Sequence, residues 1–230
     1  GFRVSGVAAA VVEAEDSRVV RRCIEWVAAE ETACSLVLRN AAGRLLTILA
    51  EVEPDALDDL ESWWKLEDHI SIVISPTTDR TRRKWATALL AFLMNDRRGG
   101  RAIADVAVVA LPGATESLPV ALVRRVVEDL VPALSPATNP EGLSTHHQEL
   151  EVALRCLIFI GEYQETLAPV LRWGLTEVLL KLVRDRLAQS PRTENEELGL
   201  DFAALELCSR LLPHKAFASK FVANGGMELL

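Results

Sequence analysis

The stretch that decides the fold runs from Leu154 to Leu230 and contains LRCLIFIGEYQETLAPVLRWG, LTEVLLKLVRDRLAQ and LDFAALELCSRLLPHKAFASKFVANGGMELL. Apolar residues recur in it at the three- and four-residue spacing of amphipathic helices. One apolar stripe is Leu175, Val178, Leu179, Leu182, Val183 and Leu187, and another is Phe202, Leu205, Cys208 and Leu212, widened by Ala204, Leu207 and Leu211. Short breaks separate the stripes at Gly161, Gly174, Ser190-Pro191, Pro213 and Asn224-Gly225-Gly226. This succession of helices and short breaks predicts an all-α, armadillo/HEAT-like right-handed helical solenoid.

The same pattern occurs upstream. Helices are expected over Ala33–Val52, with an interruption at Asn40 or Gly43, and over Thr78–Asn95, Ala102–Leu111 and Pro119–Leu134. Shorter signals place a weak helix at Val7–Glu15, a helix cap at Ser17, a first helical turn at Pro54, and capping boxes at Thr145 with Gln148 and Thr193 with Glu196. Helices with the strongest pattern begin near Gly43, Lys84, Val152 and Phe202, at intervals that bracket the armadillo/HEAT period.

We therefore expect one solenoid in two parts. Residues 1–134 form the first part, residues 135–144 form a proline-rich loop, and residues 145–230 form the second part. The absence of an initiator methionine and the helical pattern at Leu230 predict that the chain is a piece of a longer protein.

The segment HISIVIS, His69 to Ser75, alternates polar and β-branched residues and taken alone predicts a strand. No second convincing strand is available to pair with it, and an unpaired strand leaves its backbone groups unsatisfied. We therefore expect the segment to be helical or irregular.

Bulk composition narrows the function classes. The 230 residues carry a net charge of -8, which disfavours nucleic acid as the main partner. No apolar run reaches the roughly 18 residues of a membrane span. The cysteines are Cys23, Cys34, Cys156 and Cys208, without a C-x-x-C pair, and we expect buried, reduced thiols in an intracellular protein.

No catalytic constellation is evident, and we expect no cofactor or metal. There is no glycine-rich nucleotide loop. His146-His147 lacks further ligands at zinc spacing and is expected in a solvated loop. Cys208 lies near His214 in sequence, but its place in an apolar stripe argues against a nucleophile–base pair.

A basic cluster is the one candidate interaction site. Arg80, Arg82, Arg83 and Lys84 begin one predicted helix, and Arg97 and Arg98 follow it, with Arg101 close behind. A solvated helix face is the ordinary interpretation, and a docking patch for an acidic partner is the functional alternative.

Two short motifs resemble a known family. GEYQE at Gly161–Glu165 and the run from His214 through FVANGG to Gly226 resemble the N-terminal armadillo-like region of the Vpr-binding protein family, the substrate receptors of cullin-4 RING ubiquitin ligases. Weaker similarity covers Ala41–Asp105, including NAAGRLL from Asn40 to Leu46, and stronger similarity covers Leu157–Leu230. The long polar insertion of that family is reduced here to the short segment Ser135–Ser144.

The resemblance implies a non-enzymatic protein-interaction scaffold of the nucleus and cytoplasm. Its partners would be cullin-4 ligase subunits and substrates, with self-association as a further property. One alternative is a peptide-binding armadillo module that takes basic peptides, although none of the five tryptophans has asparagine four residues later, as import-type grooves require. Another is a helical enzyme such as an atypical kinase, although the glycine-rich loop, strand lysine and H-R-D/D-F-G motifs of kinases are missing.

Overall fold

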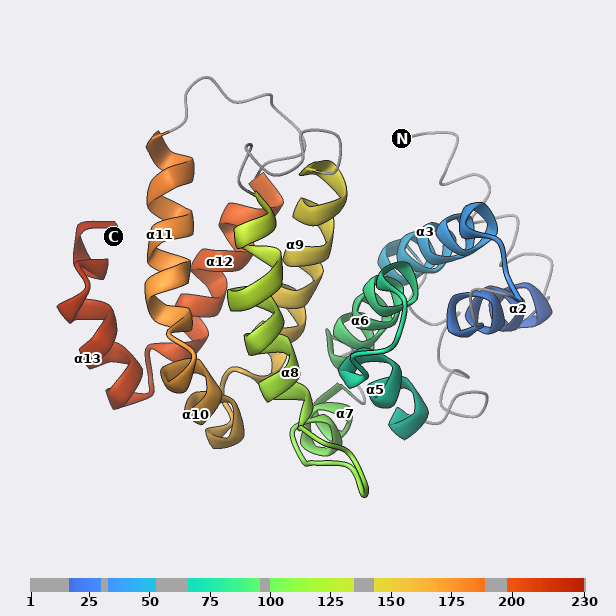
Figure 1. Cartoon of the computed structure of the whole chain (residues 1–230), viewed down its shortest axis with the longest axis horizontal. Helices are drawn as coiled ribbons and strands as arrows, with labels where there is room; N and C mark the ends of the chain where they lie inside the picture. Colours follow the sequence, from blue (N-terminus) through green and yellow to red (C-terminus); the bar gives the residue numbers. More distant parts are fainter. Residues whose placement is uncertain are drawn as a thin grey trace. The chain divides into compact units, whose positions relative to one another are not determined.

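The computed structural model describes residues 17–29, 33–52, 66–95, 100–134, 143–188 and 198–229, and this part of the chain is helical without a strand (Figure 1). Its α-helices are α2 Ser17–Ala28, α3 Leu36–Val52, α5 Leu66–Ile74, α6 Arg80–Asn95, α7 Gly100–Ala107, α8 Leu118–Arg125, α9 Leu143–Ile160, α10 Gln164–Arg172, α11 Leu175–Ala188, α12 Leu198–Leu211 and α13 Lys215–Ala223. The π-helix η2 spans Val126–Leu130, and the 3₁₀ helices η3 and η4 span Pro132–Leu134 and Gly226–Leu229. The expected all-α class is confirmed.

The chain divides into two compact units, Gly1–Ile103 and Ala104–Leu230. In the first unit α3 packs against α2 and α6, and α6 also packs against α5. Apolar side chains from α2, α3 and α6 form its core: Val20, Cys23, Ile24, Val27, Ala42, Leu46, Leu49, Trp85 and Leu89. Within each helix these residues recur at the three- and four-residue spacing of an amphipathic helix.

Helix α3 passes through Asn40 and Gly43 without a break, so the expected interruption at either residue is wrong. Both positions serve the packing of α3 against α6. The indole Nε1–H of Trp85 donates to Asn40 Oδ1 at 2.9 Å. A Cβ at Gly43 would overlap the Trp85 ring, so glycine is kept there for close helix contact and not to end the helix.

The HISIVIS segment is helical and belongs to α5. Its buried residues His69, Ile70, Val73 and Ile74 recur at helical spacing. The ring Nε2 of His69 lies 2.7 Å from the Ala86 carbonyl oxygen of α6, and since a carbonyl only accepts, Nε2–H donates. Burial against α6 therefore determines the helical backbone of this segment, and the alternation of β-branched residues does not.

The second unit begins with an irregular helix. The expected continuous helix Pro119–Leu134 is divided into α8, η2 and η3, and the amide of Val131 bonds the Val126 carbonyl in a π-type turn at 3.1 Å. Pro132 gives the physical reason: it has no N–H, and its ring would clash with the carbonyl four residues earlier in a regular α-helix. The π and 3₁₀ turns re-route the backbone around that residue.

A helix–turn–helix unit occurs twice in the second unit. Helix α9 is followed by a turn at residues 161–163 and the nine-residue α10, and α12 is followed by a turn at 212–214 and the nine-residue α13. Gly174 and Gly225, 51 positions apart, end these short helices with φ of 71° and 74°. Left-handed glycine is the usual helix stop. A repeat of this length lies within the spacing that the sequence predicted.

The long helices of the two copies lie side by side in parallel. Arg210 Nη1 of α12 pairs with Glu162 Oε1 just after α9, at 2.8 Å, and a Cβ at Gly199 would meet the Glu151 carboxylate of α9. The two contacts connect residues 48 positions apart, one near the start of α12 and one near its end. Two parallel helices, each followed by a turn of the same length, are compatible with the predicted solenoid. Its handedness stays a prediction.

Several boundaries differ from expectation. Helix α7 ends at Ala107 and not near Leu111. Helix α9 begins at Leu143, so Thr145 is inside its first turn and the capping box there is wrong; this helix also takes in the last two residues of the expected loop. Outside the described residues lie Val7–Glu15, Pro54, Ser135–Gly142 and Thr193–Glu196.

Candidate interaction site

The predicted basic cluster is partly engaged within the protein. Arg80 and Arg101 are exposed, Arg82 and Arg83 are half-buried and Lys84 is buried; Arg97 and Arg98 lie outside the described residues. The Lys84 ammonium lies over the Trp85 ring, 4.4 Å from its centre, in a cation–π contact. Docking of an acidic partner to this cluster stays a prediction.

Arg83 closes the turn that leads into α6. Its Nη2 donates to the carbonyl oxygens of Thr78 at 2.6 Å, Ser75 at 3.0 Å and Pro76 at 3.2 Å. These carbonyls follow the end of α5, where the last backbone acceptors have no partner within the helix. The side chain of Arg83 therefore stabilises the α5–α6 connection.

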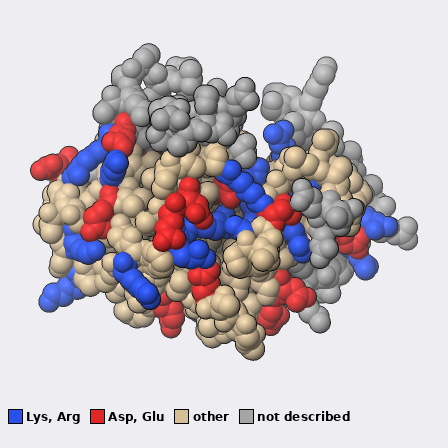
Figure 2. All heavy atoms as spheres, viewed as in Figure 1, with Lys and Arg blue, Asp and Glu red and all other residues tan. Residues whose placement is uncertain are grey.

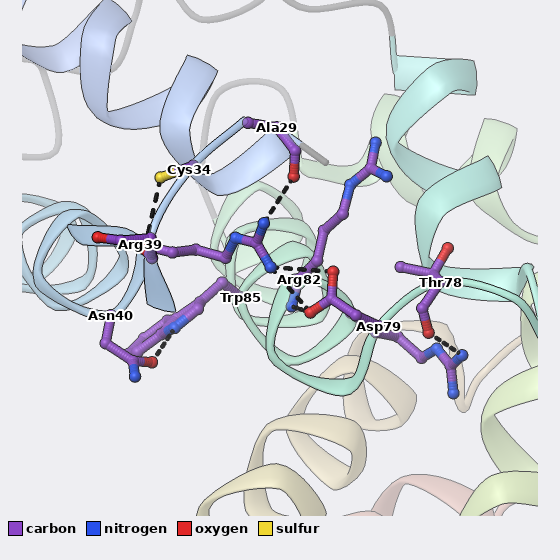
Figure 3. Close-up of polar contacts among 10 residues, drawn as sticks. Ala29, Cys34, Arg39, Asn40, Thr78, Asp79, Arg82 and Trp85 are labelled. Carbon is purple, nitrogen blue, oxygen red and sulfur yellow. Dashed lines mark hydrogen bonds and ion pairs between the residues drawn. The ribbon is translucent and has the colours of Figure 1, made fainter. Parts of the chain in front are cut away.

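A buried arginine connects α3 to the start of α6 (Figure 3). Arg39 is 1% exposed; its Nη1 lies 2.8 and 2.9 Å from the two carboxylate oxygens of Asp79, and its Nη2 donates to the Ala29 carbonyl at 2.9 Å. Asp79 also accepts from the Arg82 amide at 2.9 Å, which makes it the N-cap of α6. No pattern in the sequence indicates that Arg39 is buried.

A second buried ion pair lies in the Ala104–Leu230 unit. Arg125 Nη2 of α8 and Glu149 Oε1 of α9 are 3.1 Å apart, with side chains only 6% and 3% exposed. Helical spacing alone would place Arg125 on the polar face of this helix, opposite its apolar residues, but its side chain is buried. The residue lies where α8 packs against α9, immediately before the π-helix.

The two motifs that carry the family resemblance meet in space. His214, the N-cap of α13, has its Nε2 2.9 Å from the Gly161 carbonyl oxygen and donates to it. A Cβ at Gly161 would lie 3.3 Å from Arg210 Cβ, while Arg210 pairs with Glu162. GEYQE and the start of the run that ends in FVANGG thus form one joint between the two copies of the repeated unit.

The GEYQE turn has further hydrogen bonds of its own. The Tyr163 hydroxyl donates to Asp105 Oδ1 of α7 at 2.7 Å. The buried Thr166 hydroxyl donates to the Ile160 carbonyl at 2.6 Å, which satisfies an acceptor at the end of α9. The turn between α9 and α10 is therefore hydrogen-bonded both to α7 and to the end of α9.

The FVANGG segment is held against α11. Arg184 Nη2 donates to the carbonyls of Asn224 and Gly225 at 2.8 and 2.9 Å. Lys220 Nζ lies 3.1 Å from Glu177 Oε1. Burial acts to raise the pKa of the Glu177 carboxyl, but its own backbone amide, Lys220 and Asn224 outweigh it, and its net pKa is lowered. These contacts fix the end of α13.

The thiols are buried and unpaired, as the sequence predicted: Cys23, Cys34, Cys156 and Cys208 are all free. Burial raises the pKa of Cys23 to about 11 and that of Cys208 to about 12, so these two are protonated near neutral pH. Within the described ranges no group of three or more His, Cys, Asp or Glu side chains could hold a metal ion. None of the described helices is long and apolar enough to cross a membrane.

Charges of both signs are interspersed on the face of the molecule drawn in Figure 2, with uncharged surface between them. The geometry thus offers packed helical joints and mixed surface charge.

Residues 140–230 match the model of a family described as the Mahjong helical domain. This range includes both GEYQE and FVANGG. No curated protein and no solved structure matches the chain.

Proposed function

We propose that this chain is a non-enzymatic protein-interaction scaffold, part of a substrate receptor of a cullin-4 RING ubiquitin ligase. The observation that carries the proposal is the joint at Gly161 and His214, where the two motifs that resemble the Vpr-binding protein family pack on each other. The two motifs are far apart in sequence but contact each other in the structure. This contact supports their belonging to one structural unit more strongly than either motif does alone. The match of residues 140–230 to a helical-domain family covers the same unit.

The geometry suits a scaffold. Parallel, closely packed long helices with short connections leave their outer faces available to partners along a continuous surface. Buried apolar side chains hold α9 against α12, and the Glu162–Arg210 and Glu177–Lys220 pairs add contacts between neighbouring segments, so that a partner would meet a preformed face. In this role the unit would organise a ligase assembly or bind its substrates in the nucleus and cytoplasm.

Cross-linking mass spectrometry of the full-length protein, captured from cells in its native complex, tests the proposal. We expect cross-links from α9–α13 to cullin-4 ligase subunits, to ubiquitinated substrates or to a second copy of the chain. A control with the same reagent after denaturation identifies random links. Native complexes that contain this chain and give no such links from these helices would overturn the proposed function.

A further inference from the structure

Two residues of an apolar stripe that the sequence analysis predicted on α12 lie on the surface. Phe202 and Leu205 on α12 are 69% and 43% exposed. The buried side of α12 is instead made by residues on its opposite rows: Leu200, Ala203, Ala204, Leu207, Cys208 and Leu211. Because Phe202 and Leu205 are three positions apart, they are neighbours on one helix face. Exposed aromatic side chains next to other apolar groups are typical of binding surfaces.

The exposed row of α9 continues this surface. Arg155 is exposed and Val152 and Phe159 are half-buried, at positions that share one face of α9. The helices are parallel, and the contacts between them, at Glu151 and at Arg210, come from residues beside these rows. The rows therefore flank one contact line. We name this surface, made of Val152, Arg155, Phe159, Phe202, Leu205 and Glu206, the α9–α12 face.

One carboxylate on the α9–α12 face has no basic partner among the described residues. Arg155 pairs with Glu151 at 2.7 Å, and Arg210 beside the face pairs with Glu162 at 2.8 Å. Within the described part of the chain Glu206 makes no hydrogen bond or ion pair, and it lies one turn from Phe202. The basic groups are thus matched internally, while an apolar anchor point lies next to an unmatched negative charge.

From this arrangement we propose that the α9–α12 face binds an amphipathic peptide segment of a partner protein, one that places an apolar side chain against Phe202 and Leu205 and a lysine or arginine against Glu206. The inference rests on the proposed scaffold function and names the chemistry of the partner. Desolvated apolar contact would supply most of the affinity, and the Glu206 contact would set orientation and charge preference.

Fluorescence anisotropy with the 230-residue protein tests this inference. The probes are two labelled amphipathic peptides of equal length and spacing, one of leucine and lysine and one of leucine and glutamate. We expect the lysine peptide to bind more tightly. Phe202→Ser should weaken its binding about tenfold or more, and Glu206→Gln should weaken it about two- to fivefold and reduce its salt dependence.

Matched controls lie elsewhere on the surface. Val222→Ser removes another apolar side chain that is 55% exposed, and Glu228→Gln removes an exposed carboxylate. Both should leave peptide binding unchanged, with circular dichroism confirming that every variant is folded. Equal weakening by the controls, absence of lysine-peptide binding, or self-association of the protein that is lost in Phe202→Ser would each overturn the inference. If ligase cross-links were found but the lysine peptide did not bind, the proposed scaffold function would stand and only the proposed role of the α9–α12 face would be overturned.

Discussion

Glu149→Ala is expected to destabilise the protein by about 3–5 kcal/mol, because it removes the carboxylate that compensates the buried Arg125 guanidinium between α8 and α9. A buried charge without its counter-ion retains its full desolvation cost. Urea denaturation followed by circular dichroism measures the change in the free energy of unfolding, provided that the transition of the Ala104–Leu230 unit is resolved.

Two further variants make this prediction specific. Glu162→Ala removes an ion pair whose side chains are 47% and 63% exposed, and it should cost less than about 1 kcal/mol. The double variant Arg125→Met with Glu149→Leu removes both charges and fills the space, so it should recover most of the lost stability. If Glu149→Ala were no more harmful than Glu162→Ala, the buried pair would not have the assigned role.

A second large effect is expected at low pH, where the protein should lose stability. Burial, with a smaller contribution from the charge on Arg82, lowers the pKa of His69 from 6.5 to about 3, although its bond to the Ala86 carbonyl opposes the shift. The unfolded chain therefore binds one more proton than the folded chain between pH 6.5 and 3. The His69 contribution to stability is complete above about pH 6.5 and decreases as the pH falls, by up to about 1.4 kcal/mol per pH unit.

His69→Gln isolates this contribution, because the glutamine amide does not titrate and offers an N–H donor for the Ala86 carbonyl. We expect the wild-type free energy of unfolding to fall by about 2–3 kcal/mol more than that of the variant between pH 6.5 and 4.5. Equilibrium denaturation at a series of pH values measures both curves. Parallel curves would show that His69 is not held neutral by burial.

Secondary structure was largely predictable where apolar periodicity was long and the helix ends carried clear signals. Trp85, Leu89 and Met94 in α6 are buried as the spacing predicts, and the helix starts within two residues of expectation because Asp79 caps it. Periodicity did less well near Pro132, where a local backbone requirement interrupts an otherwise continuous apolar pattern. Pro132 is visible in the sequence, and its ring disfavours a regular α-helical carbonyl four residues upstream.

Side-chain burial was harder to predict than helix position. Arg39 and Arg125 are buried because a carboxylate from a distant segment meets each of them, and such pairing is decided by tertiary structure. Conversely, Phe202 and Leu205 are exposed because α12 packs with other rows against α9 and α11. The sequence shows that α12 has apolar residues on several faces, and it does not show which face stays outside.

The motifs had a similar limit. GEYQE and FVANGG were identified as a resemblance, but nothing in their sequence predicts that His214 donates to Gly161 or that Arg184 holds the end of α13. The basic cluster is visible in the sequence, but the contacts of Arg83 with the turn between α5 and α6 and of Lys84 with the Trp85 ring depend on the fold. The role of each of these residues is therefore decided by the residues that it contacts, and not by its residue type.

The most direct test of the scaffold function is hydrogen–deuterium exchange of this chain, alone and with an excess of purified cullin-4 ligase complex. The account predicts slower exchange in amides of α9 and α12 when the complex is present, with the first unit changed less. Exchange that is unchanged throughout α9–α13 at saturating ligase concentration would contradict it.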